Sequence, residues 1–458
     1  MGEIMQIDTS IFKAYDIRGI YPTQLNEETA YRIGKAYATL IQTENPGKTL
    51  NIVVGNDMRL SSPQLKSRLL DGLTEMGVNV IDIGLASTPT FYFAVAFYGY
   101  EGGVQVSASH NPKDYNGMKL VRAGAVPVSG ETGMKTLAEL SDKNQFTPSK
   151  TKGTITKKTG ILEDLVKDQT KTIDLKSIKP LKIAVDAANA MGSLDIEAMF
   201  KGLPCKLVKV NFKLDGTFPS HEADPFKDEN LKAVQDAVEE HCCDLGISID
   251  GDGDRYFFVD ENGELIRQEI LRGIMAQLAL KDNPGATVCY DIRPGRITRD
   301  MIDSVGGKSS ITRVGHSLIK EQMIKENAVF GGESSGHFFY QFDYGSFESP
   351  IMYVLGLLEF ISEKNQPVSK IMDPYRVYFH SGEINSVVED PDGKMKELGE
   401  KYADAEISHL DGVTITYPNF WFNVRKSNTE PKLRLNLEAK TKETMEQKRD
   451  EVLAVIKS

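Results

Sequence analysis

The sequence predicts an α/β protein: three similar α/β domains with mixed sheets in tandem, then a smaller α+β domain at the C-terminus. Three observations predict this class. The 458 residues suggest three domains at about 150 residues each, and four smaller ones are also allowed. Short apolar strands alternate with helices in three successive copies, which is typical of parallel strands covered by helices on both faces. Near residue 369 the alternation stops, and strands and helices follow in mixed order.

The first copy shows how the elements are predicted. An apolar strand at residues 50–55 is followed by a helix with Ser62 as the expected N-cap and Pro63 at the first helical position. One face of this helix is apolar and carries Leu65, Leu69, Leu73 and Met76. The copy continues with a strand at residues 78–84, a helix that begins at Thr88 and a strand at residues 102–109.

The second and third copies follow the same pattern. In the second copy we expect strands at residues 181–187, 205–211 and 244–250, and helices near residues 196–200 and 229–242. In the third copy we expect helices at 269–280, 296–305 and 317–326, and strands at 286–292, 309–314 and 328–332. The C-terminal domain is predicted to have strands at 377–384, 412–417, 420–425 and 432–439, with helices at 398–403 and 442–457.

Two polar segments with proline, at residues 144–160 and 362–376, are predicted to be linkers. We expect four domains, comprising residues 1–150, 151–256, 257–368 and 369–458.

Composition and charge exclude several classes of protein. Hydrophobic residues make up 40% and charged residues 26% of the chain, which argues against disorder. The net charge of −11 gives no general electrostatic reason to bind nucleic acid or an anionic membrane. Four cysteines without a CxxC motif predict reduced thiols. The N-terminus lacks the pattern of a signal peptide, and no apolar run approaches the ~20 residues of a membrane helix. We therefore expect a cytoplasmic protein.

A polar cluster follows the last strand of the first copy, at residues 107–119. Ligands of doubly wound sheets bind outside the carboxyl ends of the strands, so such clusters are candidate sites. Ser109 could act as a nucleophile or carry a phosphoryl group. A serine hydrolase is a poor alternative, because no GxSxG motif is present. An ordinary turn remains the other interpretation.

Three aspartates on alternate residues, Asp250, Asp252 and Asp254, end the second copy. Closely spaced carboxylates with intervening glycines suit a hard cation such as Mg²⁺. An EF-hand loop is a weaker alternative, because Arg255 stands where a sharp turn requires glycine. The predicted hairpin turn at residues 262–263 would also place Glu261 at its tip. A solvated acidic loop is the remaining alternative, although the three charges would repel one another without a cation.

Two further clusters suit a phosphorylated sugar. Residues 331–338 offer Glu333, Ser334, Ser335 and His337, the mixture of acceptors and donors that hydroxyl-rich ligands need. Residues 423–435 offer Arg425, Ser427, Asn428 and Thr429, which suit a phosphate dianion. A flexible linker and a solvated loop, respectively, are the alternative interpretations.

These clusters, in this order, resemble the α-D-phosphohexomutase family, specifically its phosphomannomutase/phosphoglucomutase branch. The resemblance covers nearly the whole chain and rests on FKAYDIRG, SASHNP, DGDGDR, GESSGH and RKSNTEP. It implies four domains around a central cleft, each contributing one loop. Asn428 and FKAYDIRG favour the mannose/glucose branch over the glucosamine branch.

The resemblance implies a role for each cluster. Ser109 is expected to be a phosphoserine that exchanges its phosphoryl group with a hexose 1-phosphate or 6-phosphate through a hexose 1,6-bisphosphate, which also serves as activator. Ser109 and the three aspartates are expected to hold Mg²⁺. Charge stabilisation and proton transfer are assigned to Arg18, Lys119, Arg255 and His337. The expected substrate-binding residues are His110, Arg293, His316, Glu333, Ser335, Arg425, Ser427, Asn428 and Thr429.

The implied enzyme is a phosphomannomutase/phosphoglucomutase that acts on a small phosphosugar as a monomer or homodimer, without nucleic acid or membrane partners. Three alternatives stay open. One is a phosphoglucosamine mutase with the same mechanism. Another is a phosphatase with Asp250 as its nucleophile, for which Ser109 would be dispensable. The third is a non-catalytic sugar-phosphate-binding protein, which would need neither Ser109 nor the three aspartates.

Overall fold

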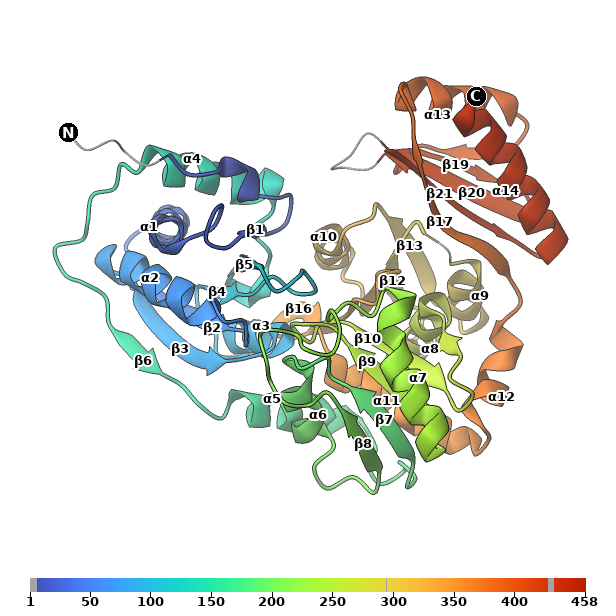
Figure 1. The fold of residues 1–458 in the computed structure, drawn as a ribbon, viewed down its shortest axis with the longest axis horizontal. Helices are drawn as coiled ribbons and strands as arrows, with labels where there is room; N and C mark the ends of the chain where they lie inside the picture. The colour runs from blue at the N-terminus through green and yellow to red at the C-terminus, as the bar shows by residue number, and fades with distance from the viewer. Residues whose placement is uncertain (1–5, 294, 427–431) are drawn as a thin grey trace. The chain divides into compact units, whose positions relative to one another are not determined.

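The computed structural model describes residues 6–293, 295–426 and 432–458. The chain divides into two compact units. The first comprises Met1–Leu265 and His337–Ser369, and the second comprises Ile266–Gly336 and Lys370–Ser458. Figure 1 labels the helices and strands of the chain.

The first sheet combines parallel and antiparallel strands in the order β1-β5-β4-β2-β3-β6. Its strands are β1 (Ile17–Ile20), β2 (Asn51–Asn56), β3 (Asn79–Leu85), β4 (Gly102–Val106), β5 (Tyr115–Arg122) and β6 (Ile155–Lys157). β2 pairs in parallel with β3 and β4, and β3 pairs in parallel with β6. β5 runs antiparallel to β1 and β4. The three predicted strands therefore form the parallel centre, and the sequence analysis missed the outer strands.

The helices of the first domain confirm the predicted apolar face and correct a helix start. They are α1 (Glu27–Glu44), α2 (Ser62–Glu75), α3 (Thr88–Phe97) and α4 (Lys135–Lys143). The predicted apolar face of α2 is buried. Its N-cap is Ser61, and Ser62 is the first helical residue. The prediction of Ser62 as N-cap was wrong by one residue, because Ser62 already lies within the helix, where its hydroxyl donates to Asp57 Oδ1 at 2.6 Å.

The second sheet has the order β11-β10-β9-β7-β8. Its elements are α5 (Ile161–Gln169), β7 (Lys182–Asp186), α6 (Gly192–Met199), β8 (Lys206–Val210), α7 (Asp228–His241), β9 (Leu245–Ile249), β10 (Tyr256–Asp260) and β11 (Leu265–Ile266). β7 lies between β8 and β9 and is parallel to both, whereas β10 is antiparallel to β9. The predicted turn at residues 262–263 is present, with Gly263 at φ 74°. The Glu261 carboxylate accepts hydrogen bonds from Ser369. Glu261 therefore does not belong to the group formed by the three aspartates.

In the second unit, β12 (Thr287–Asp291) lies between β13 (Lys308–Thr312) and β14 (Phe330–Gly332), parallel to both. The accompanying helices are α8 (Gln268–Asp282), α9 (Arg296–Ser304) and α10 (His316–Glu326). The antiparallel pair β15 (Phe338–Phe342) and β16 (Gly345–Glu348), followed by α11 (Pro350–Lys364), belongs to the first unit.

The C-terminal sheet is antiparallel and has the order β17-β21-β20-β19-β18. Its strands are β17 (Phe379–Val387), β18 (Glu406–Ser408), β19 (Val413–Thr416), β20 (Phe420–Lys426) and β21 (Lys432–Ala439). Helices α13 (Pro391–Lys401) and α14 (Lys442–Lys457) cover this sheet (Figure 1). Leu433, Leu435 and Leu437 alternate along β21 and enter the same core as Val452 and Ile456 of α14. The predicted α+β C-terminal domain is confirmed.

Both predicted linkers contain secondary structure. Residues 144–160 include β6, which extends the first sheet. Residues 362–376 include the end of α11 and the short helix α12 (Val368–Met372). Polar composition and proline therefore do not exclude a short edge strand or a short helix, and the two linkers stay predictions.

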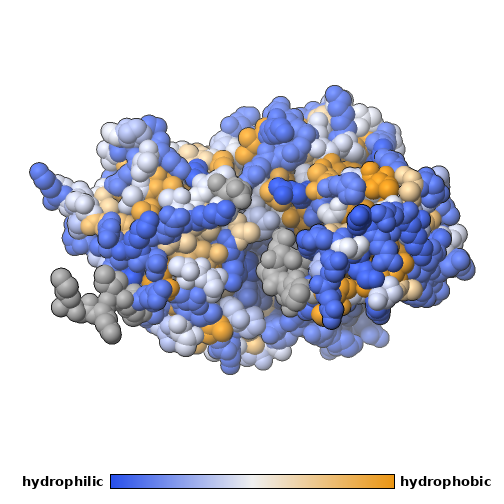
Figure 2. Space-filling view, turned by 90° about the horizontal axis from the view of Figure 1, so that it is seen from above, coloured by the Kyte–Doolittle hydropathy of each residue, from blue (hydrophilic) through white to orange (hydrophobic). Residues whose placement is uncertain are grey.

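The hydrophilic character of the surface agrees with the 26% of charged residues in the sequence. Most of the face shown in Figure 2 is hydrophilic, with small hydrophobic patches between the charged residues. Among the described helices, none is both long enough and apolar enough to cross a membrane.

Candidate functional site

Ser109 lies just past the end of β4 in a strained, buried conformation. Its φ of 50° is in the left-handed region, which is uncommon for a residue with a side chain and costs about 1–3 kcal/mol. Only 3% of the residue is exposed. Its backbone N–H donates to Ser107 Oγ at 3.1 Å, and His110 Nδ1 lies 3.3 Å from Ser109 Oγ. Burial lowers the pKa of His110 well below its ordinary value, and the charges of Arg255 and Arg18 add to this effect.

The guanidinium of Arg59 holds the loop around Ser109. Arg59 is 1% exposed and donates to four backbone carbonyl oxygens. These are the carbonyls of Ser109 at 2.8 Å, Asn111 at 2.6 Å, Pro112 at 2.8 Å and Tyr115 at 3.0 Å. The sequence analysis missed Arg59, although its position just after a buried strand was a signal.

Three buried aspartates face Ser109 from the loop between β9 and β10. Asp250, Asp252 and Asp254 have no exposed surface, and each offers an oxygen within 4.8 Å of the others. Ser109 Oγ donates to Asp250 Oδ2 at 3.0 Å. The structure therefore brings together the predicted serine and the predicted aspartates, and Ser109 and Asp250 are 141 residues apart in the chain.

Two buried cations, Lys119 and Arg255, contact the three carboxylates. Lys119 Nζ lies 2.8 Å from Asp252 Oδ2 and 2.6 Å from Asp254 Oδ2. Arg255 donates to Asp250 Oδ2 from Nε at 3.0 Å and from Nη2 at 2.8 Å. Although burial opposes the charged form, the pKa of Lys119 is raised well above its ordinary value by Asp252 and Asp254. Burial, together with the charge of Asp254, raises the pKa of Asp250 to about 8.

The aspartates fit a hard divalent cation. Asp252 Oδ1 and Asp254 Oδ1 are buried and have no hydrogen-bond partner among the described residues. Buried carboxylate oxygens without donors are costly unless a cation binds them. All three groups offer oxygen ligands, which Mg²⁺ prefers. The residues therefore fit a magnesium ion, as the sequence predicted.

Arg18 lies beside the serine loop. It donates from Nε to Asp16 Oδ2 at 2.8 Å and from Nη1 to Asn111 Oδ1 at 2.6 Å. Burial lowers the pKa of Arg18, but the Asp16 carboxylate outweighs that effect and raises it. The predicted cations Arg18, Lys119 and Arg255 are thus all in contact with the serine loop or the aspartate loop.

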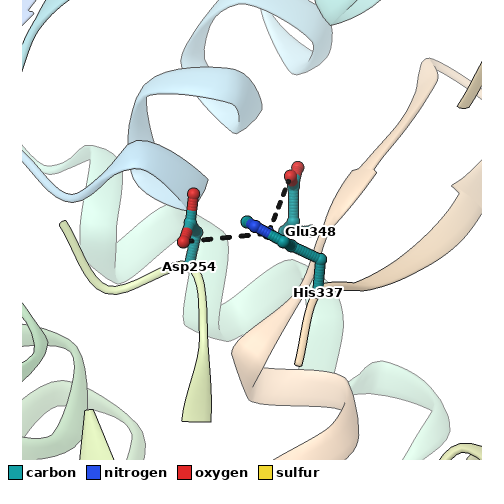
Figure 3. A group of neighbouring side chains, drawn as sticks. All are labelled: Asp254, His337 and Glu348. Carbon is teal, nitrogen blue, oxygen red and sulfur yellow. Dashed lines mark ion pairs between the residues drawn. The ribbon is translucent and has the colours of Figure 1, made fainter. Parts of the chain in front are cut away.

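His337 lies between two carboxylates (Figure 3). Its Nδ1 is 3.8 Å from Asp254 Oδ1 and 3.5 Å from Glu348 Oε1. Glu348 is the last residue of β16 and is 1% exposed. The sequence analysis missed Glu348, because no motif surrounds it and its contact with His337 depends on the pairing of β15 with β16.

In the second unit, Asp291 organises the loop that carries Glu333. Asp291 accepts hydrogen bonds from both the backbone and the hydroxyl of Ser334, each at 2.8 Å. Arg293 Nη2 lies 2.8 Å from Asp291 Oδ2 and 3.3 Å from Glu333 Oε1. Ser335 Oγ donates to Glu333 Oε2 at 2.6 Å. The predicted residues Arg293, Glu333 and Ser335 therefore form one group, and Ser334 anchors it.

The remaining predicted residues of the second unit are partly described. His316 is the first residue of α10. Arg425 Nη2 lies 2.8 Å from Glu383 Oε2, and Arg434 Nη1 lies 3.2 Å from Glu383 Oε1. The predicted residues Ser427, Asn428 and Thr429 lie outside the described residues. Arg434 and Glu383 were not singled out from the sequence, and strand pairing is what places them beside Arg425.

Comparison with known proteins gives matches over nearly the whole chain. The sequence matches the alpha/beta/alpha domains I, II and III of phosphoglucomutase/phosphomannomutase over residues 9–148, 162–263 and 269–378. It matches the C-terminal domain of the same family over residues 383–455. These four matches confirm the predicted three α/β domains followed by a C-terminal domain.

Individual relatives agree with these matches. The chain is 39% identical to a phosphomannomutase from Vibrio cholerae over 442 residues, covering 94% of this chain and 95% of that protein. It is 38% identical to a phosphomannomutase from Methanocaldococcus jannaschii over 454 residues, covering 98% of each. A crystal structure of a phosphoglucomutase/phosphomannomutase family protein from Burkholderia thailandensis superposes with a TM-score of 0.90 at 31% identity, covering 98% of both chains. The serine and aspartate loops, the fold and these similarities together show that the chain belongs to the phosphoglucomutase/phosphomannomutase family.

Proposed function

We propose that this protein is a phosphohexose mutase that interconverts hexose 1-phosphates and hexose 6-phosphates, with Ser109 as the phosphoryl carrier. The observation that carries this proposal is the 3.0 Å hydrogen bond from Ser109 Oγ to Asp250 within a buried group of three carboxylates. A serine in this position can carry a phosphoryl group beside a cation site. The substrates we propose are mannose and glucose phosphates.

The reaction has two balanced halves. In the first, a sugar hydroxyl attacks phosphoserine. A new P–O bond to the sugar forms, the P–O bond to Ser109 breaks, the sugar hydroxyl gives its proton to a base, and the Ser109 oxygen takes up a proton. In the second, the Ser109 hydroxyl attacks the other phosphate of the hexose 1,6-bisphosphate. The P–O bond to Ser109 forms, the P–O bond to the sugar breaks, the Ser109 proton passes to a base, and the sugar oxygen takes up a proton. The bisphosphate must therefore turn around between the two halves.

Asp250, Asp252, Asp254 and phosphorylated Ser109 would hold Mg²⁺, which when bound offsets negative charge on the transferring group. Lys119 keeps two of the carboxylates in place and adds positive charge beside them. Arg18, Arg255 and His337 are proposed for charge stabilisation and proton transfer around the reacting hydroxyl. Their contacts with the serine and aspartate loops support this assignment.

Substrate binding is assigned to the residues of the sugar and phosphate motifs. Glu333 and Ser335, fixed by Arg293, would accept and donate hydrogen bonds to sugar hydroxyls, with His110 and His316 as further contacts. Arg425 would bind the phosphate that is not transferred, together with Ser427, Asn428 and Thr429. The Glu383 carboxylate holds the Arg425 guanidinium at 2.8 Å, which supports a fixed position for this phosphate-binding cation. A hexose 1,6-bisphosphate activator, a monomeric or homodimeric state and a cytoplasmic location complete the proposal.

A turnover comparison tests this function. Purified protein with Mg²⁺ and a trace of hexose 1,6-bisphosphate is given mannose, glucose or glucosamine 1-phosphate, and the 6-phosphate is measured. We expect turnover of the mannose and glucose forms and little of the glucosamine form. Preference for glucosamine would keep the mechanism and overturn the proposed substrate. Release of inorganic phosphate in place of a 6-phosphate would indicate the phosphatase, and binding without turnover would indicate a sugar-phosphate-binding protein.

A further inference from the structure

The first residue of α3, Thr88, contacts the aspartate loop. Thr88 is fully buried. Its hydroxyl donates to Asp252 Oδ2 at 2.6 Å, and its backbone N–H donates to the carbonyl oxygen of Asp252 at 2.9 Å. This N–H belongs to the first turn of α3, where backbone donors have no partner within the helix. One residue of the first domain therefore fixes both the side chain and the backbone of Asp252.

The two carboxylate oxygens of Asp252 have different surroundings. Oδ2 accepts from Thr88 and also lies 2.8 Å from Lys119 Nζ. Oδ1 is buried and has no hydrogen-bond partner within the described part of the chain. The hydroxyl and the ammonium group thus occupy one oxygen and leave the other available as a metal ligand.

The start of α3 is itself held in place. Ser87, its N-cap, donates to the buried carboxylate of Asp195 at 3.0 Å. Gly253 of the aspartate loop lies against the same two residues. A Cβ atom on Gly253 would lie 3.1 Å from Asp195 Oδ2 and 3.3 Å from Ser87 Cβ. This close packing leaves Thr88 little freedom to move away from Asp252.

We propose that Thr88 is a positioning residue of the magnesium site, which holds the Asp252 carboxylate in the orientation that leaves Oδ1 free to bind the cation. The inference rests on the proposed function, in which the three aspartates bind Mg²⁺. Outer-shell hydrogen bonds of this kind typically change metal affinity about 10–100-fold.

The test is direct metal binding, with Mn²⁺ as the probe and electron paramagnetic resonance of free Mn²⁺ as the signal. Dephosphorylated wild-type protein is compared with Thr88→Val, which keeps the shape and removes the hydroxyl, and Thr88→Ser, which keeps the hydroxyl. Thr74→Val is the matched control, because the Thr74 hydroxyl donates to carbonyl oxygens of its own helix. We expect Thr88→Val to bind Mn²⁺ about 10–100-fold more weakly, and Thr88→Ser and Thr74→Val to keep most of the affinity.

The activity of Thr88→Val gives a second measurement. The Mg²⁺ concentration for half-maximal turnover should rise, and saturating Mg²⁺ should recover most of kcat. If Thr88→Val does not fold, Thr88→Ala is measured in the same way. Wild-type Mn²⁺ affinity in Thr88→Val would overturn the proposed role of Thr88. Weakening of Mn²⁺ binding in Thr88→Ser as large as in Thr88→Val would also overturn it. Neither result would overturn the metal site itself. Absence of Mn²⁺ binding by the wild-type protein would overturn the proposed metal site and this inference with it.

Discussion

The backbones of Gly251 and Ser109 lie so close together that a side chain at position 251 would not fit. A Cβ atom on Gly251 would lie 2.3 Å from the carbonyl oxygen of Ser109. Ser109 itself has the left-handed φ of 50°. The hydrogen bond from Ser109 to Asp250 therefore depends on a glycine in the aspartate loop as well as on the two side chains that form it.

We predict that Gly251→Ala destabilises the protein by about 1–3 kcal/mol and slows phosphoryl transfer, because the two loops must separate. Urea unfolding and the rate of Ser109 phosphorylation measure the two effects. Gly399→Ala is the control, because Gly399 lies in α13 and an added Cβ there meets no atom within 4 Å. Alanine should leave that helix unchanged or more stable. Equal behaviour of the two variants would contradict the argument.

His221 provides a pH-dependent contribution to stability. Its Nε2 lies 2.8 Å from Asp186 Oδ2, and this hydrogen bond raises the pKa of His221 above 6.5. A folded pKa above the unfolded value means that the stabilisation is fully present below the unfolded pKa and is lost as pH rises through the folded pKa. We predict that the unfolding free energy lost in His221→Asn is larger near about pH 5.5 than near about pH 8.5. Urea unfolding at both pH values checks this, with the exposed His409→Asn as control. A loss that does not change with pH would contradict it.

The sequence predicts those site residues that lie in contiguous motifs. Ser109 and the aspartates follow strands as dense polar runs, and the structure brings them together. Arg59, Thr88 and Glu348 escape sequence analysis because each is a single residue whose partner is remote in the chain. Only tertiary packing creates their contacts. The roles assigned to the predicted residues stay predictions until variants are measured.

At the scale of elements, β16 supplies a carboxylate that the motifs do not contain. Glu348 at the end of this strand lies 3.5 Å from His337 Nδ1. A carboxylate beside a histidine fixes the orientation of the ring and favours its charged form. Figure 3 shows His337 between Glu348 and Asp254.

We predict that Glu348→Gln lowers kcat about 10-fold or more while the protein stays folded, because the neutral amide interacts more weakly with the ring. Steady-state kinetics and circular dichroism measure the two properties. Glu359→Gln, on the neighbouring α11, is a control of the same chemistry away from His337. A kcat that stays at the wild-type value would show that Glu348 only supports the fold.

Strand and helix prediction succeeded where the patterns were strong. The apolar runs of β2, β4, β7, β9 and β12 were found because each is buried along nearly its whole length. The outer strands β1, β5 and β6 were missed. β6 is exposed along its length and β1 is short, so neither has the apolar signal of a central strand. The domain boundaries stay a prediction, since β6 joins the first sheet from within the expected linker.

For the whole molecule, the buried carboxylates link metal binding to stability. The three aspartates offer oxygens within 4.8 Å of one another, so their negative charges repel in the folded protein. A bound cation reduces this repulsion and therefore stabilises the folded state. A ligand that binds only the folded state adds about 2.7 kcal/mol of stability at a concentration 100-fold above its Kd.

We predict that Mg²⁺ raises the midpoint of thermal unfolding and that a chelator reverses the rise. Asp252→Asn should lose this response, whereas Asp236→Asn, at an exposed position on α7, should keep it. Potassium chloride at equal ionic strength controls for screening of surface charge. An unfolding midpoint that does not respond to Mg²⁺ would contradict a metal site at these aspartates.

The central claim is that Ser109 carries the phosphoryl group during turnover. The most direct measurement is mass spectrometry of peptides after the protein is incubated with hexose 1,6-bisphosphate and freed of ligand. We predict phosphate on Ser109, its loss when a hexose monophosphate is added, and no mutase turnover in Ser109→Ala, with phosphosugar binding kept within about tenfold. Full mutase activity in Ser109→Ala, or phosphate on a different residue, would contradict it.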